Sequence, residues 1–174
     1  MNIRNGASGW KLLLLICLLM ISATQVSAQT IHRLDSSASP RQQVAAVQVL
    51  NENGLPFAQT PFSREAHAQF GRVEYRLATA AFVGRRVRID LVLPPSVPGL
   101  RRASGLVFHW RGLDGALSGQ VQPGQRLALW TGTIEQALTT LSIELGMRLD
   151  TSAIGNWNGG SFGVEPSFEL AVLP

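Results

Sequence analysis

The three histidines of the chain are its first candidates for acid–base or metal chemistry, and none has a second histidine at the spacing of a metal site. His32 has Asp35 three residues after it, and His67 has Glu65 two residues before it. A single pair of this kind in a loosely organised segment does not make a catalytic site. His109 alternates with apolar neighbours, which predicts a strand residue that faces the surface and is no ligand.

The carboxylates and hydroxyls offer no clearer reaction. Glu165 and Glu169 share one face of the last predicted strand and could work as general acid and base, but two carboxylates on an exposed strand face more often only solvate it. Ser161, between Gly160 and Phe162, lacks the strand-to-helix turn of a nucleophile elbow. No glycine-rich segment follows a strand and opens a helix to hold phosphate. We therefore expect a protein that is not an enzyme and that has no catalytic, cofactor or metal site.

Tryptophan side chains could form a platform for carbohydrate. Trp110 and Trp130 lie in predicted strands, which favours core or half-buried positions. Trp157 lies in the turn Asn-Trp-Asn-Gly-Gly and is the tryptophan that we expect to be exposed. It is therefore the residue that a glycan-binding hypothesis would use.

Residues 1–28 have the pattern of a secretory signal peptide. Arg4 and Lys11 precede the apolar run 12–21, and Val-Ser-Ala at 26–28 supplies small residues for cleavage. The run is too short for a membrane span. A lipoprotein signal at Cys17 is the alternative, but the preceding Ile16 is too bulky for it. We expect an exported chain from residue 29 without cysteine, held together by burial and without a disulfide.

The charge of the exported chain excludes one class of partner. The whole sequence has a net charge of +4, from 15 basic and 11 acidic residues. Loss of Arg4 and Lys11 leaves 13 arginines against 11 acids, or +2, and no lysine. Small arginine clusters at 85–88 and 101–102 are typical of a solvated strand face. A charge this small predicts no nucleic-acid surface.

The exported part divides into a polar arm, residues 29–43, and one domain, residues 44–174, which is long enough for its own core. Residues 44–50 are apolar and fit either a strand or a helical turn. Alternation of apolar and polar residues predicts strands separated by glycine and proline turns, at 72–82, 86–93, 104–111, 125–131 and 162–172. This is the pattern of a single antiparallel β-sandwich with at most one short helix.

Residues 133–149 fit two templates. A helix would have Thr133 as N-cap, Gln136 at its third position and Gly146 as C-cap. A strand would alternate from Leu141 to Leu149, and the β-branched mixture Thr-Thr-Leu-Ser-Ile favours it slightly. Both readings stay open at this point.

The order of segments resembles pilins of the chaperone–usher pathway, in particular the alpha-fimbrial class (coli-surface-antigen and cable-pilus type), which also lacks disulfides. The likeness covers about residues 44–174 and rests on order and spacing. It is carried by Asn-Gly-Leu-Pro at 53–56, Gly-Arg-Arg-Val-Arg-Ile-Asp-Leu-Val-Leu at 84–93, Leu-Val-Phe-His-Trp-Arg-Gly at 106–112, Leu-Ser-Ile-Glu-Leu at 141–145, Gly-Asn-x-x-Gly-Gly-Ser-Phe-Gly at 155–163 and Phe-Glu-Leu-Ala-Val at 168–172.

The resemblance implies an immunoglobulin-like sandwich that lacks one strand and receives it from a periplasmic chaperone and then from a neighbouring pilin subunit, at an outer-membrane usher. Phe168, Leu170 and Val172 would then line the acceptor groove, and Ile31 and Leu34 would belong to the donor arm. The chain would be a fimbrial or pilus subunit that passes through the periplasm to the cell surface and contributes to adhesion. The arm departs from the pattern, because Ile31 and Leu34 do not share a parity; the donor segment would then extend into 44–50, or the chain would be a minor, tip or terminating subunit.

Two other classes remain open. One is a self-complete periplasmic binding module, or a small envelope domain of the type found in secretins and outer-membrane receptors, which the helical reading of 133–146 would favour. The other is a secreted hydrolase or lectin that uses Trp157.

Overall fold

The computed structural model describes residues 30–40, 46–60, 62–155 and 163–174. The expected signal peptide and Trp157 lie outside the described residues. Within them the chain forms nine strands: β1 (Ile31–Leu34), β2 (Gln48–Asn51), β3 (Glu65–Ala78), β4 (Arg86–Val92), β5 (Leu106–Leu113), β6 (Gly119–Val121), β7 (Arg126–Thr133), β8 (Leu138–Asp150) and β9 (Ser167–Val172). Four 3₁₀ turns of three residues each connect them, at Phe57–Gln59, Ala80–Phe82, Ala103–Gly105 and Thr151–Ala153.

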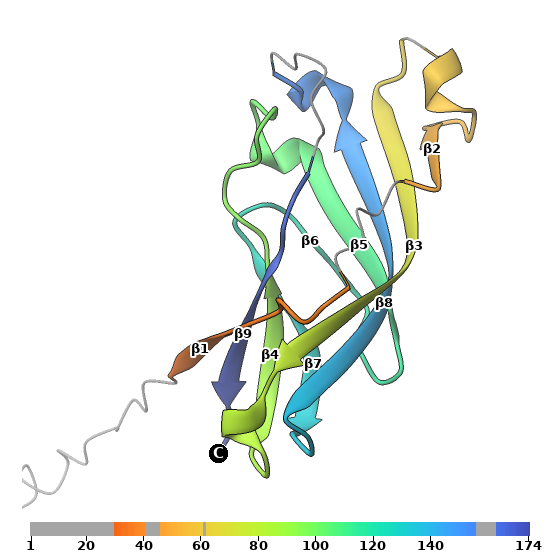
Figure 1. Cartoon of the computed structure of the whole chain (residues 1–174). Coiled ribbons are helices and arrows are strands. Elements are labelled where there is room, and N and C mark those ends of the chain that lie inside the picture. Colours follow the sequence, from red (N-terminus) through yellow and green to blue (C-terminus); the bar gives the residue numbers. More distant parts are fainter. Residues whose placement is uncertain (1–29, 41–45, 61, 156–162) are drawn as a thin grey trace, which may run out of the picture.

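The strands form two antiparallel sheets that face each other (Figure 1). Sheet A has the order β1-β9-β4-β7, and sheet B has the order β2-β3-β8-β5-β6. The chain crosses between the sheets from β3 to β4 and again from β8 to β9, while β3 pairs with β8 and β4 pairs with β9. Two interlocked strand pairs of this kind are typical of immunoglobulin-like sandwiches. The prediction of a single antiparallel β-sandwich is confirmed.

In the ambiguous segment 133–149, residues 138–149 lie in a strand and no residue is helical, so its helical interpretation was wrong. β8 runs from Leu138 to Asp150 and pairs with β3 on one side and with β5 on the other. Its odd-numbered residues Leu141 and Ile143 are buried between the sheets. Hydrogen bonds to two neighbours and burial of one face outweigh the local capping signals at Thr133 and Gly146.

Strand β3 begins seven residues before the predicted start at residue 72, because a β-bulge hides its periodicity. The register shifts between Gln69 and Gly71, and Gly71 has a φ of 71°, which favours glycine. Inward residues are even-numbered before the bulge (Ala66, Ala68) and odd-numbered after it. An alternation that changes parity does not read as one strand.

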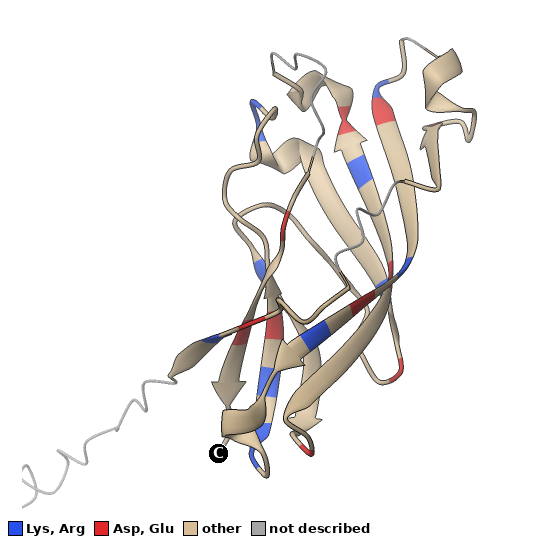
Figure 2. Cartoon of the chain, in the orientation of Figure 1, with Lys and Arg blue, Asp and Glu red and all other residues tan. Residues whose placement is uncertain are grey.

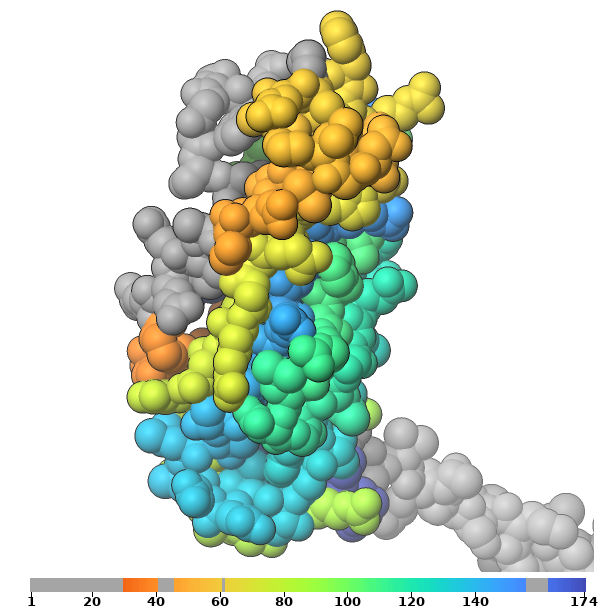
Figure 3. All heavy atoms as spheres, turned by 90° about the vertical axis from the view of Figure 1, so that its right-hand side faces the viewer, coloured from red at the N-terminus to blue at the C-terminus, as the bar shows by residue number. Residues whose placement is uncertain are grey.

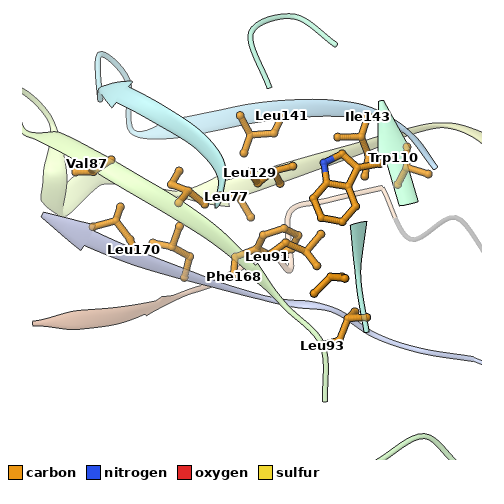
Figure 4. Packing of buried hydrophobic residues seen from close by; sticks show 14 of the residues in the cluster. Leu77, Val87, Leu91, Leu93, Trp110, Leu129, Leu141, Ile143, Phe168 and Leu170 are labelled. Carbon is orange, nitrogen blue, oxygen red and sulfur yellow. The ribbon is translucent and has the colours of Figure 1, made fainter. Parts of the chain in front are cut away.

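The main core fills the space between the sheets in the half of the molecule that is lower in Figure 1, and Figure 4 shows its packing. Strand β4 contributes Val87, Ile89 and Leu91, and β9 contributes Phe168 and Leu170 from the same sheet. Sheet B contributes the post-bulge half of β3 and the first half of β8 to the same cluster. This core holds the two sheets together, since the described residues contain no disulfide.

A second apolar cluster lies above the first, and sheet A contributes no strand to it. Its buried members come from β3, β5, β8 and the loop 93–105: Ala66, Ala68, Val97, Leu106, Met147 and Leu149. The reason is length: β3 has 14 residues and β8 has 13, whereas β4 has seven and β9 has six. Figure 1 shows β3 and β8 running most of the length of the molecule, beyond the end of β4. The upper part of sheet B is therefore faced by loops.

Truncation of Leu77 tests this division of the core. Leu77 is fully buried in β3, so Leu77→Ala should lower the free energy of unfolding by about 2–5 kcal/mol. Leu138→Ala is a matched control, since Leu138 is 48% exposed at the start of β8 and should change the stability by less than about 0.5 kcal/mol. Chemical denaturation of both variants measures the difference, and equal effects would contradict the packing described.

Candidate strand-binding groove

One edge of sheet A is closed by the N-terminal arm of the same chain. β1 pairs antiparallel with β9, with Leu34 opposite Phe168 and His32 opposite Leu170. Residues directly opposite each other share a face, so Leu34 and His32 lie on the inward face of sheet A, where Leu34 is buried and His32 stays exposed. Leu34 is 7% exposed, and the ring of His32 lies 5.1 Å from the ring of Phe82. The inward face of β1 therefore holds one buried aliphatic side chain.

The predicted donor-arm residues lie on opposite faces of this strand. Leu34 belongs to the main core, while Ile31 points outwards opposite Ala171 and is 49% exposed. The predicted acceptor residues Phe168 and Leu170 are fully buried in the main core between the sheets, on the strand beside β1, and Val172 packs partly buried against the same core. In this state of the molecule they are covered by their own chain.

The chain leaves β9 immediately after Leu34 and crosses to sheet B. The Asp35 carbonyl accepts a hydrogen bond from the Ala78 amide (2.9 Å), and the Ser39 hydroxyl accepts one from the Arg76 amide (2.9 Å). Asp35 also accepts hydrogen bonds from the amide and hydroxyl of Ser37, which hold the pKa of its carboxyl below its usual value. Figure 3 shows residues 35–40 against the lower part of β3 and β2 against its upper part. This crossing limits β1 to four residues.

Above the crossing, a groove of about 1580 Å³ opens between the sheets. Its walls are mainly apolar and come from both clusters. They include Ala66, Ala68, Phe70, Val73, Tyr75, Leu91, Leu93, Phe108, Trp110, Leu145, Met147, Leu149, Val164, Pro166 and Phe168. Charged and hydroxyl groups from residues 35–39 and 72–76, with Glu165, form part of the lining. The segment 163–166, which leads into β9, has no ladder partner among the described residues.

Tyr75 and Phe168 form the lower end of the groove. Their ring centroids are 4.7 Å apart at an interplanar angle of 56°, so the rings pack in a tilted arrangement. Burial raises the pKa of the Tyr75 hydroxyl to about 12. Below them the space between the sheets is filled by the main core.

The other residues singled out in the sequence lie outside this groove. His67 contacts Glu65 (3.1 Å) on the outer face of sheet B. His109 faces the same side, packs against Gly146, and has its pKa lowered chiefly by burial. Trp110 is buried, with its indole N–H donating to the Leu117 carbonyl (2.7 Å), and Trp130 is half-buried. The described residues contain no group of three His, Cys, Asp or Glu that could hold a metal ion.

Glu165 and Glu169, which the sequence places on one face of the last strand, have different surroundings. Glu165 is at the rim of the groove, and Glu169 is on the outer face of sheet A, 3.0 Å from the guanidinium of Arg126. Their arrangement gives no shared site for a substrate.

Apart from Phe168, the groove walls were not predicted from the sequence. The alternation of Ala66 and Ala68 with polar residues was the available signal, together with a run from Leu141 to Leu149 that is longer than the run in β4. The bulge hides the first signal, and the second has a meaning only when the strand lengths of the two sheets are compared.

Comparison with known proteins adds no relative. No family model, no curated protein and no solved structure matches the chain. Among the described residues, none of the helical segments has the length and apolar character needed to cross a membrane.

Docking of β1 depends on Leu34. Leu34→Ala should lower the free energy of unfolding by about 2 kcal/mol and increase hydrogen exchange at the amides of residues 31–34, because it removes the buried aliphatic contact of the strand. Ile31→Ala, on the exposed face of the same strand, is the matched control and should leave both quantities nearly unchanged. If the two variants behave alike, β1 is not held by its inward face.

Tyr75 is the only tyrosine, so phenolate absorbance reports its titration alone. It should ionise near pH 12 in the folded protein and near pH 10 in denaturant. A raised pKa means that the folded state favours the protonated form. The stability that Tyr75 contributes is therefore complete below pH 10 and falls by about 3 kcal/mol as the pH rises to 12. A folded-state pKa near 10 would show that the hydroxyl is not buried at the end of the groove.

Proposed function

We propose that this chain is an exported structural subunit of a surface fibre, a fimbria or pilus, and that its groove receives a β-strand from another subunit. The observation that carries the proposal is the open apolar groove alongside residues 163–168, which continues the edge of β9 beyond the end of β1. A sheet edge next to an apolar groove is suited to strand addition, in which the backbone supplies affinity and alternate side chains fill the groove.

The geometry of β9 specifies how such a strand would lie. Continued in the register of β1, it would run antiparallel to 163–171, with inward side chains opposite Leu170, Phe168, Pro166 and Val164. Each apolar side chain buried there would stabilise the complex by about 1.5–3 kcal/mol. A strand that runs the full length would face the upper cluster, which no strand of sheet A reaches.

The short length of β1 makes it replaceable. It makes one ladder of four residues, and Leu34 is its single buried aliphatic side chain. A partner strand of about nine residues would form the same ladder and extend it past the point where this chain crosses to β3. The arm would then be free to serve a neighbouring subunit.

The identity of the partners rests on the resemblance to chaperone–usher pilins. In that reading the strand comes first from a periplasmic chaperone and then from a neighbouring pilin subunit at an outer-membrane usher. Export through the periplasm to the cell surface, and a contribution to adhesion, belong to the same proposal.

A second candidate function is a self-complete binding module of the cell envelope. It is favoured by one observation, the pairing of β1 with β9 in the same chain, which closes the lower half of the sandwich without a partner. The two functions differ in whether an added strand binds.

A synthetic peptide separates them. It has the sequence of residues 29–39 with His32→Val, Ser36→Val and Ala38→Val, which makes every inward position from 32 to 38 apolar. The fibre-subunit proposal predicts that this peptide binds the exported chain, measured by titration calorimetry. A control peptide keeps His32→Val and has Asp35→Val and Ser37→Val in place of the substitutions at 36 and 38. These two valines lie on the outward face, so the control should bind at least about tenfold more weakly.

Two protein variants locate the binding. Val164→Arg places a guanidinium in the groove and should weaken binding of the peptide at least about tenfold, since a charge would be buried without a partner. Ser167→Arg adds the same side chain next to the groove, on the outward face of β9, and should have little effect. Absence of binding by either peptide, together with a monomer that unfolds cooperatively and reversibly, would contradict the proposal and favour the self-complete module.

A further inference from the structure

Three charged residues form a row across the outer face of sheet A. In the ladder, Arg33 of β1 is directly opposite Glu169 of β9, and Glu169 is directly opposite Asp90 of β4. Figure 2 shows basic and acidic positions side by side on these strands. Two carboxylates opposite each other destabilise a sheet unless cations compensate them.

The two carboxylates are compensated to different degrees. Both oxygens of Asp90 accept hydrogen bonds from Arg88, at 2.8 and 3.0 Å. Glu169 Oε2 lies 3.0 Å from the guanidinium of Arg126, yet this buried oxygen accepts no hydrogen bond with acceptable geometry. Glu169 is therefore the less compensated of the two carboxylates, and its cross-strand neighbour on the side away from β4 belongs to β1.

Arg33 supplies that charge across the ladder. Its side chain is exposed and is beyond ion-pair distance of Glu169, so the attraction acts between cross-strand neighbours and needs no fixed hydrogen bond. Attraction of this type acts between opposite charges that face each other on a sheet.

Alternative registers lose this pairing. A slip of β1 by one residue exchanges its two faces. A slip by two residues keeps the faces but places either Asp35 or Ile31 opposite Glu169, so an acid or an apolar side chain replaces the cation. The inward side chains of β1 distinguish these registers less well, because they are only His32, which is exposed, and Leu34, which is buried.

We propose that Glu169 determines the register and the identity of the strand bound beside β9, by selecting a segment with a basic residue directly before the apolar residue that covers Phe168. In the described chain this segment is β1, with Arg33 before Leu34. For a strand from a second subunit the inference rests on the proposed function; for β1 within the chain it does not.

A double-mutant cycle on the exported chain tests the selection within one molecule. Arg33→Glu should reduce the hydrogen-exchange protection of residues 31–34 about five- to tenfold, because an attraction becomes a repulsion. Arg33→Lys should keep the protection within about twofold. In a Glu169→Gln background, Arg33→Glu should change it by less than about twofold, since the charge that it opposes is gone. Arg85→Glu, which lies outside β1 and β9, is the control for net charge and should have no effect.

The peptide described above extends the test to a second molecule. Its Arg33→Glu form should bind the exported chain about five- to tenfold more weakly than the parent peptide, and Glu169→Gln in the protein should remove that difference. An effect of Arg33→Glu that persists unchanged in the Glu169→Gln background would overturn the proposed role of Glu169. If neither peptide binds while the cycle within the chain shows coupling, the fibre-subunit function fails and the role of Glu169 in setting the register of β1 stands.

Discussion

The structure depends on a mismatch in length between two packed sheets. At about 3.3 Å per residue, the 14 residues of β3 extend over roughly 45 Å, whereas the six or seven residues of β9 and β4 extend over about 20 Å. Sheets in a sandwich stabilise each other by burying their inner faces. Here the lower half does so fully, and the upper half of sheet B is left facing loops and a groove of about 1580 Å³.

The mismatch also explains how the edges are managed. Three of the four edge strands, β1, β2 and β6, have three or four residues, and short edges limit unwanted pairing, whereas the fourth, β7, has eight residues. On the other side of sheet A, β1 covers residues 168–171 of β9 and leaves the preceding segment unpaired among the described residues. The edge that is available for strand addition therefore lies where sheet B extends beyond sheet A.

Strands with uninterrupted alternation of apolar and polar residues were predicted from the sequence. Strands that are interrupted by a bulge, or that form only because a neighbouring strand pairs with them, were not. β4 and β7 were placed within two residues of their observed bounds. The first half of β3 was missed because the bulge at Gly71 changes its parity, and β1 was missed because its ladder with β9 is formed by a polar arm with one apolar inward residue. The sequence predicted that Phe168 and Leu170 share an apolar face of the last strand. It could not predict which segment pairs with that strand. The position of the groove depends on the difference in strand length between the two sheets. The residues of one segment alone do not show this difference.

The magnitudes indicate why the groove should be selective. A partner strand of nine residues would order about five more residues than β1 does, at about 1–2 kcal/mol of backbone entropy each. Three further apolar side chains would return about 4.5–9 kcal/mol, and each added hydrogen bond about 0.5–1.5 kcal/mol. These terms nearly cancel, so one polar residue at an inward position, or one acid opposite Glu169, is enough to tip the balance towards β1. The weakly held strand β1 therefore makes the groove selective, because only a segment with the full alternating pattern and the matching charge displaces it.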